Sequence, residues 1–104
     1  MSINPLDKSN LPQEEIWVLR LYIAGKSAKS TLAIANLQRI CEEFLEDRYK
    51  IEVIDLVEQP HIARKEQIIA VPTLIKTLPL PLKQIIGDLS NQEKVLKGLD
   101  LRKL

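Results

Sequence analysis

The stretch IWVLRLYI, at residues 16–23, decides the fold of this 104-residue chain. It is a nearly continuous run of apolar residues that favour β-structure, and Arg20 is its one charged interruption. Such a run is typical of a strand that is buried on both faces in a parallel sheet. We therefore expect an α/β domain built around this strand.

A helix and a second strand follow this run. After a small, polar turn at residues 24–30, apolar side chains recur at steps of three and four residues, which predicts an amphipathic helix. These side chains are Leu32, Ala33, Leu37, Ile40, Cys41, Phe44 and Leu45. The stretch KIEVIDL, at residues 50–56, predicts the next strand. A strand, a helix and a strand in this order indicate a right-handed βαβ unit.

The second half of the chain completes a thioredoxin-like pattern. Pro60 suits the first turn of a helix, which we expect to continue to about residue 69. The stretch VPTLIKTL, at residues 71–78, and residues 82–86 predict two further strands on either side of a proline-rich corner. Ser90 and Glu93 form a capping-box pattern that opens a last helix at QEKVLKGLDL, with Val95, Leu96 and Leu99 on one stripe. The expected order is βαβαββα.

Composition and charge exclude several classes of protein. Fifteen Lys and Arg residues against fourteen Asp and Glu give a net charge of +1, which favours neither nucleic acid nor an anionic membrane surface. No run approaches the roughly 18 apolar residues that span a bilayer, and we expect a cytoplasmic protein. Residues 1–15, with Pro5 and Pro12 and no periodicity, are expected to be a flexible arm before one domain at residues 16–104.

Candidate catalytic motifs are incomplete. Gly25, Lys26 and Ser27 resemble the end of a phosphate-binding loop, but Arg20 occupies the place of its first glycine. Cys41 is the single cysteine and lies on the apolar stripe of the first helix, so we expect a buried side chain and no redox chemistry. His61 has no second histidine or cysteine near it, and a surface position is expected. We expect no catalytic residue, metal or cofactor.

Pro72 invites a different interpretation. It begins the predicted strand at residues 71–78, where thioredoxin-like folds place a cis-proline that faces the first turn. A proline on an edge strand is the alternative. In thioredoxin-like folds the exposed backbone beside this proline binds peptides or glutathione, so a binding surface could exist without catalysis.

Four stretches of the chain resemble the KaiB family. They are LRLYIAGKSAKS at residues 19–30, EVIDLVEQP at 52–60, IIAVPTLIK at 68–76 and IIGDLSNQEKVLKGLDL at 85–101. The resemblance runs without obvious gaps from about residue 16 to 101, and its last block is highly specific. It identifies residues 16–104 as a KaiB domain.

The resemblance implies a non-enzymatic regulator. KaiB proteins bind the N-terminal ring of the hexameric ATPase KaiC and modulate its phosphorylation and ATPase cycle, in clocks or in stress-linked signalling. In clocks they also capture KaiA or compete with a histidine kinase. The alternative is a free-standing thioredoxin-like sensor or peptide-binding module, similar to the KaiB-like input domain of a clock histidine kinase.

The resemblance also implies site residues near the second helix. Family members place KaiC-facing side chains there, where this chain has His61, Arg64, Lys65 and Gln67. The family's acidic stretch ending in lysine is replaced here, because Arg64, Lys65, Glu66 and Gln67 precede IIAVPT.

A fold switch is the last implied property. KaiB proteins rest as a homo-oligomer, a dimer or tetramer, in which the second half pairs differently so that the chain follows the order βαββααβ, and they bind KaiC as a thioredoxin-like monomer. Gly98 costs the last helix about 1 kcal/mol relative to alanine, a size comparable to the gap between two packings of one chain. Asp100 near the helix C-terminus adds an unfavourable dipole interaction of about 0.3 to 1 kcal/mol. Both residues favour the alternative packing.

Overall fold

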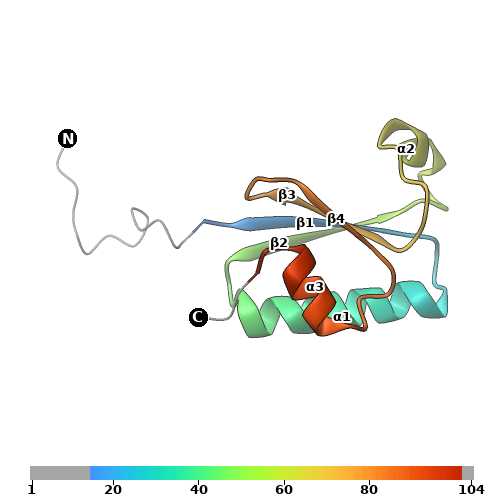
Figure 1. Cartoon of the computed structure of the whole chain (residues 1–104). Helices are drawn as coiled ribbons and strands as arrows, with labels where there is room; N and C mark the ends of the chain where they lie inside the picture. Colours follow the sequence, from blue (N-terminus) through green and yellow to red (C-terminus); the bar gives the residue numbers. More distant parts are fainter. Residues whose placement is uncertain (1–14, 102–104) are drawn as a thin grey trace, which may run out of the picture.

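A computed structural model of the chain describes residues 15–101 (Figure 1). The elements follow the order β1 (Trp17–Ile23), α1 (Ala28–Phe44), β2 (Tyr49–Asp55), α2 (Pro60–Lys65), β3 (Thr73–Leu78), β4 (Lys83–Ile86) and α3 (Gln92–Gly98). The thioredoxin-like order βαβαββα is therefore confirmed for this structure, and the alternative order βαββααβ is not the one observed.

The sheet is mixed, and β1 is one of its two inner strands. The strand order is β2-β1-β3-β4, with β1 parallel to β2 and antiparallel to β3, while β3 and β4 form an antiparallel hairpin. The βαβ unit is confirmed because β1 and β2 pair in parallel across α1. The expectation of a parallel environment for β1 holds only on its β2 side.

The main core lies between the sheet and two helices. Alternate β1 side chains face α1 and α3, which lie on the same side of the sheet (Figure 1). Leu19, Leu21, Leu37, Ile40 and Leu74 are completely buried there. Burying a side chain of this size contributes about 1.5 to 3 kcal/mol, so this layer supplies most of the hydrophobic stabilisation.

One buried charge belongs to this core. Lys76 on β3 is only 2% exposed. Its Nζ donates to the backbone carbonyl of Leu99, the C-cap residue of α3, at 3.2 Å and lies 4.9 Å from the centre of the Trp17 ring. The ammonium thus gains a carbonyl acceptor and an aromatic face in place of water.

Several sequence expectations were wrong in detail. Leu32 is 49% exposed rather than buried, because the buried face of α1 runs through Ser30, Ala33 and Leu37, and Leu32 lies off this face. The helix expected to reach residue 69 ends at Lys65, and Gln67 has a left-handed φ of 57°. The last helix is capped by Asn91 rather than Ser90: the Asn91 side chain accepts the Lys94 N–H at 3.2 Å.

The C-terminal end of α3 carries both residues expected to weaken it. Helix α3 ends at Gly98, so Asp100 follows the helix instead of lying inside it, with a φ of 57°. The Asp100 N–H donates to the Lys97 carbonyl, and the Leu101 N–H donates to the Leu96 carbonyl at 2.8 Å. This is the Schellman pattern, in which the position of Asp100 is usually occupied by glycine.

Gly98 is closely packed rather than free. A Cβ atom at this position would lie 2.9 Å from Cδ1 of Ile85 on β4. Alanine would gain about 1 kcal/mol in helix propensity, but Ile85 must turn aside to admit the methyl group. The net effect of Gly98→Ala on this fold is therefore smaller than helix propensity alone indicates.

Substitution of Asp100 tests the strain at the end of α3. Asp100→Gly should stabilise this fold by about 0.5 kcal/mol or more, because it relieves about 1 kcal/mol of left-handed strain. The ion pair lost to Lys83, at 3.4 Å between partly exposed groups, contributes only a few tenths of a kcal/mol. We expect the thermal midpoint to rise by roughly 2 to 5 °C.

Asp47→Gly serves as the matched control, because Asp47 is an exposed aspartate that is not among the residues of positive φ. It should leave the thermal midpoint unchanged or lower it. An equal rise in both variants, measured by circular dichroism, would show that backbone strain at Asp100 is not the cause.

Candidate partner-binding surface

Two turns are tied together at the end of the sheet where β1 and β2 finish. Gly25 begins the turn to α1 with a φ of 63°, a left-handed conformation that glycine adopts without strain. The Asp55 carboxylate, at the end of β2, accepts the backbone N–H groups of Gly25 and Val57, both at 2.9 Å. Asp55 thus ties the β1–α1 turn to the β2–α2 turn.

The same hydrogen bonds change the acidity of Asp55. The pKa of the Asp55 carboxyl lies below its usual range, chiefly because it accepts the Gly25 N–H and, second, because it accepts the Val57 N–H. A carboxyl whose pKa is lowered by folding stabilises the fold above its unfolded pKa of about 4, and this contribution disappears as pH falls through the lowered value. The turn arrangement is therefore fully stabilised at neutral pH.

The predicted partner-binding residues lie on and just after α2. His61, Arg64, Lys65 and Gln67 are all exposed. Arg64 and Lys65 occupy the last turn of the helix, where positive charge also complements the helix dipole. The structure therefore places all four residues on one short exposed segment, with Arg64 and Lys65 at consecutive positions.

An ionic cluster attaches α2 to the sheet. Arg20 of β1 points to the face opposite α1, where its Nε lies 3.2 Å from Glu52 Oε2 and its Nη1 lies 3.8 Å from Glu66 Oε1. The guanidinium lies 6.0 Å from the centre of the Tyr22 ring. Tyr22 is only 1% exposed, and burial raises the pKa of its hydroxyl. Arg20 thus joins the sheet to Glu66, the C-cap of α2.

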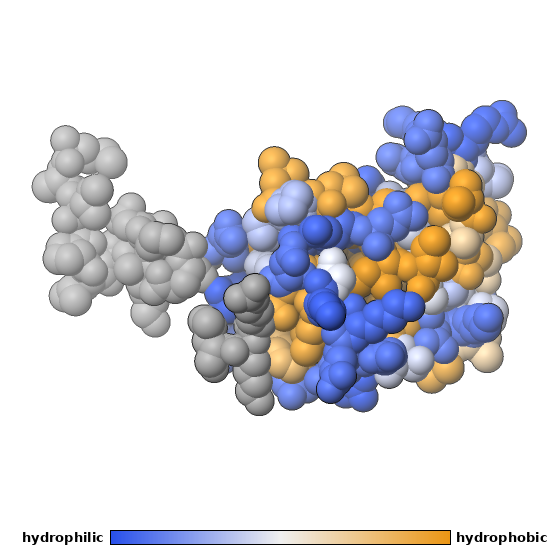
Figure 2. Space-filling model, in the orientation of Figure 1, coloured by the Kyte–Doolittle hydropathy of each residue, from blue (hydrophilic) through white to orange (hydrophobic). Residues whose placement is uncertain are grey.

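Apolar side chains are exposed at this end of the molecule. Val57 is 67% exposed, Ile69 is 87% exposed and Val71 is 39% exposed. Figure 2 shows apolar surface beside the hydrophilic helix α2. We call these three residues together with His61, Arg64, Lys65 and Gln67 the α2 surface. Its apolar residues with a basic border have the composition of a protein-binding patch.

Pro72, Ser27 and Cys41 take structural positions in this fold. The peptide bond before Pro72 is cis, and Pro72 directly precedes β3, which is an inner strand and not an edge. In the turn after β1, the neighbouring strand, the Ser27 hydroxyl caps α1 by accepting the Ser30 N–H at 3.2 Å. Burial raises the pKa of the Cys41 thiol to about 12, far from a reactive thiolate.

No cluster of three or more potential metal ligands occurs among residues 15–101. Within this same part of the chain, no helix has the length and apolar character needed to cross a membrane.

Comparison with known proteins identifies the family. The model of the KaiB domain matches residues 20–101. The chain belongs to the KaiB family. Circadian clock protein KaiB3 of a Synechocystis strain is 61% identical over 84 residues, which cover 81% of this chain and 82% of that protein. Circadian clock oscillator protein KaiB of Thermostichus vulcanus is 47% identical over 90 residues, covering 86% of this chain and 83% of that protein.

Solved structures support the thioredoxin-like fold. The N-terminal domain of Synechococcus elongatus SasA matches with a TM-score of 0.68 at 19% identity, over 96% of this chain and 93% of that one. Mitochondrial thioredoxin 3 from Saccharomyces cerevisiae matches with a TM-score of 0.64 at 19% identity, over 85% of this chain and 80% of that one. At these identities the likeness concerns the fold alone.

Sequence reasoning missed the supports of this KaiB-family surface. Arg20 was visible only as an interruption of an apolar strand, and nothing in the sequence paired it with Glu52 or Glu66. The hydrogen bonds of Asp55 to the two turns were only weakly indicated by the sequence, through an aspartate at the end of a strand followed by a turn. Lys76 had the same signal as Arg20, a lone charge inside an apolar run, but its environment is entirely different.

Substitution of Arg20 tests how α2 is held. Arg20→Met should speed amide hydrogen exchange in α2 by about two- to fivefold, because it removes both ion pairs from side chains that are about one-third exposed. Exchange in α1 should not change. Lys50→Gln is the control, since Lys50 pairs with the same Glu52 at 3.6 Å but does not contact α2. Equal effects of the two variants would contradict a specific role of Arg20.

The buried thiol gives a second test. At pH 8 a thiol with a pKa of about 12 is ionised to only about one part in 10⁴, and Cys41 is 1% exposed. The native chain should react with a disulfide reagent only as fast as it unfolds, and at once in denaturant. The control is Cys41→Ala combined with Lys26→Cys, which presents a thiol in the exposed turn. Native Cys41 reacting as fast as this control would show that the core opens readily.

Proposed function

We propose that this KaiB-family protein is a non-enzymatic regulator that binds a KaiC-like hexameric ATPase through the α2 surface and modulates its phosphorylation and ATPase cycle. The observation that carries the proposal is the α2 surface itself, where exposed Val57, Ile69 and Val71 adjoin the positive charges of Arg64 and Lys65. Relatives with 46–61% identity are named circadian clock proteins, which supports a role in clock regulation.

The chemistry of the surface indicates an acidic partner site with apolar residues at its centre. Charges at the rim of an interface mainly set the association rate and its salt dependence, whereas desolvated apolar residues supply most of the affinity. His61 and Gln67 add hydrogen-bonding groups beside the two cations. Capture of KaiA and competition with a histidine kinase are further possible roles of a KaiB-family member that engages the ATPase.

A second candidate function is a free-standing sensor or peptide-binding module. The SasA N-terminal domain favours it, since this chain covers 93% of that domain with a TM-score of 0.68. The two functions differ in the binding partner: a regulator binds the assembled ATPase ring, and a sensor module acts on a kinase or a free peptide. The higher identity to KaiB proteins supports the regulator.

We further propose that the fold described here is the binding-competent form, in exchange with a resting homo-oligomer, a dimer or tetramer, of the order βαββααβ. The weak end of α3 supports this proposal, because Gly98 lowers helix propensity and Asp100 adopts a left-handed conformation. Asp100→Gly, which relieves that strain, should therefore also raise the monomer fraction in light scattering.

Charge reversal on α2 tests the proposed function. Arg64→Glu combined with Lys65→Glu should weaken binding to a purified KaiC-like hexamer at least tenfold, mostly through slower association, and should reduce its salt dependence. The measurement is surface-based kinetics at two salt concentrations. Arg39→Glu combined with Lys97→Glu is the control with the same change of net charge, because both residues are exposed on helices α1 and α3, on the opposite side of the sheet from α2.

Binding that is equally strong in both variants would place the interface elsewhere. Absence of binding by the unmodified chain, with an intact fold, would favour the sensor module.

A further inference from the structure

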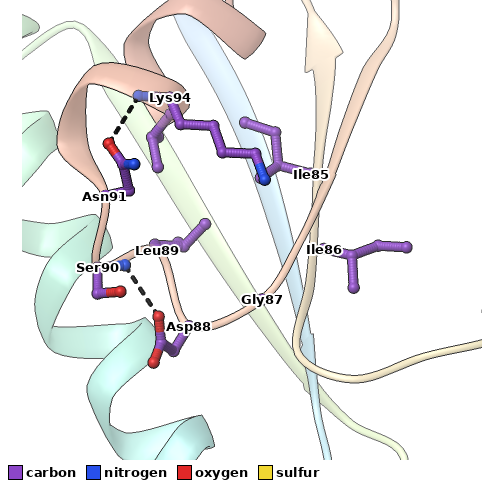
Figure 3. A pocket seen from close by; sticks show the side chains of 9 residues that line it. Ile85, Ile86, Gly87, Asp88, Leu89, Ser90, Asn91 and Lys94 are labelled. Atoms are coloured by element: carbon purple, nitrogen blue, oxygen red, sulfur yellow. Dashed lines mark hydrogen bonds between the residues drawn. The ribbon is translucent and has the colours of Figure 1, made fainter.

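A groove runs between the edge strand β4 and helix α3. Two adjoining hollows of about 130 and 490 Å³ share Ile85, Ile86 and Lys94 as lining residues. Gly98 lines the larger one, where its lack of a side chain lets Ile85 pack directly against α3. Figure 3 shows the Lys94 side chain extending from α3 across the groove toward Ile85.

The strand that borders this groove has a free edge. In the order β2-β1-β3-β4, β4 pairs only with β3. The Gly87 N–H donates to the Pro72 carbonyl at 2.9 Å, so alternate residues of β4 point their backbone groups toward β3. The N–H and C=O groups of Gln84 and Ile86 consequently point outward, in the positions that another strand would occupy.

Both hydrophobic and charged groups lie beside this edge. Ile86 is 53% exposed, and Leu82 before the strand is 59% exposed. Lys94 and Lys97 are exposed on the facing helix. Asp88 is the carboxylate that lines the groove, and one of its oxygens already accepts the Ser90 N–H at 3.0 Å. A segment lying against β4 would therefore meet apolar surface and the Lys94 ammonium, which forms no ion pair within the described residues.

We propose that the groove binds an extended segment of a partner protein with alternating acidic and apolar residues, which adds as a strand to the free edge of β4. Its backbone pairs with Gln84 and Ile86, one of its carboxylates meets the Lys94 ammonium on the α3 side of the sheet, and its apolar side chains, which point to the opposite face, pack on exposed Ile86. Backbone pairing supplies affinity, and the groove selects the side chains. None of the residues used belongs to the α2 surface, so the proposal is independent of the ATPase interaction.

A synthetic peptide tests the site directly. The probe is acetyl-Ser-Glu-Val-Glu-Val-Ser-amide, titrated into the ¹⁵N-labelled full chain and followed by amide shifts in NMR. We expect a dissociation constant of about 0.1 to 1 mM, with the largest shifts at Gln84, Ile86 and Lys94. The matched peptide with lysine in place of glutamate should bind at least tenfold more weakly.

Two pairs of variants separate the backbone from the side-chain contribution. Ile86→Pro removes the outward N–H and should abolish binding, whereas Ile86→Thr keeps it and should bind within about threefold of the unmodified chain. Lys94→Gln should weaken binding about three- to tenfold, and Lys94→Arg should restore it. If Ile86→Pro does not fold, as judged by circular dichroism, the Lys94 pair and the two peptides still decide.

Three outcomes would overturn the proposal. They are no shifts at the β4 amides at millimolar peptide, equal binding of the acidic and basic peptides, and shifts at the same amides that depend on protein concentration without peptide. The last result would assign the edge to a second copy of this chain.

Discussion

The pairing of β1 on both of its edges is the constraint on which the rest of the structure depends. Because β1 lies between β2 and β3, its backbone N–H and C=O groups are paired with strands on both sides. Its side chains alternate between the two faces of the sheet, so the apolar ones need a covering layer. Helices α1 and α3 cover one face completely, and the side chains that point there are the core. Within residues 15–101, the other face is covered by α2 and the segment after it, at one end (Figure 1).

This uneven cover explains where the α2 surface forms. Toward α2, the Tyr22 side chain is buried, whereas Arg20, two residues earlier on the same face, remains partly exposed and pairs with Glu52 and Glu66. A short helix of six residues has little stability of its own, so its place depends on the sheet below it. Residues that contact the sheet therefore fix α2, which leaves Arg64 and Lys65 exposed to a partner.

The sequence predicted the parts of this arrangement that depend on periodicity. Residues 16–23 and the apolar stripe of α1 have one interpretation each, because their patterns are long and their partners are hydrophobic. The end of α2 and the cap of α3 were misplaced by a few residues, since Gln67 adopts a left-handed conformation and Asn91 rather than Ser90 caps the helix. Arg20 and Lys76 show most clearly what the sequence could not predict, because both are single charges in apolar strands. They lie on opposite faces of the sheet. Arg20 therefore pairs with carboxylates, whereas Lys76 contacts a backbone carbonyl and an aromatic ring.

Lys76 also explains why α3 and the sheet stabilise one another despite the weakness of α3. The helix has seven residues and ends in a strained Schellman turn, so it would be marginal in isolation. Its C-cap carbonyl at Leu99 is the acceptor for a buried ammonium, and loss of α3 would leave Lys76 buried without that acceptor or force it into water. Leaving a buried charge unpaired costs several kcal/mol, more than the strain at Asp100, so α3 is retained as long as β3 keeps its present register.

A change of strand register that turned Lys76 to the other face would release α3 at the same time. The rearrangement proposed above would therefore have to move β3 and α3 together, as one unit.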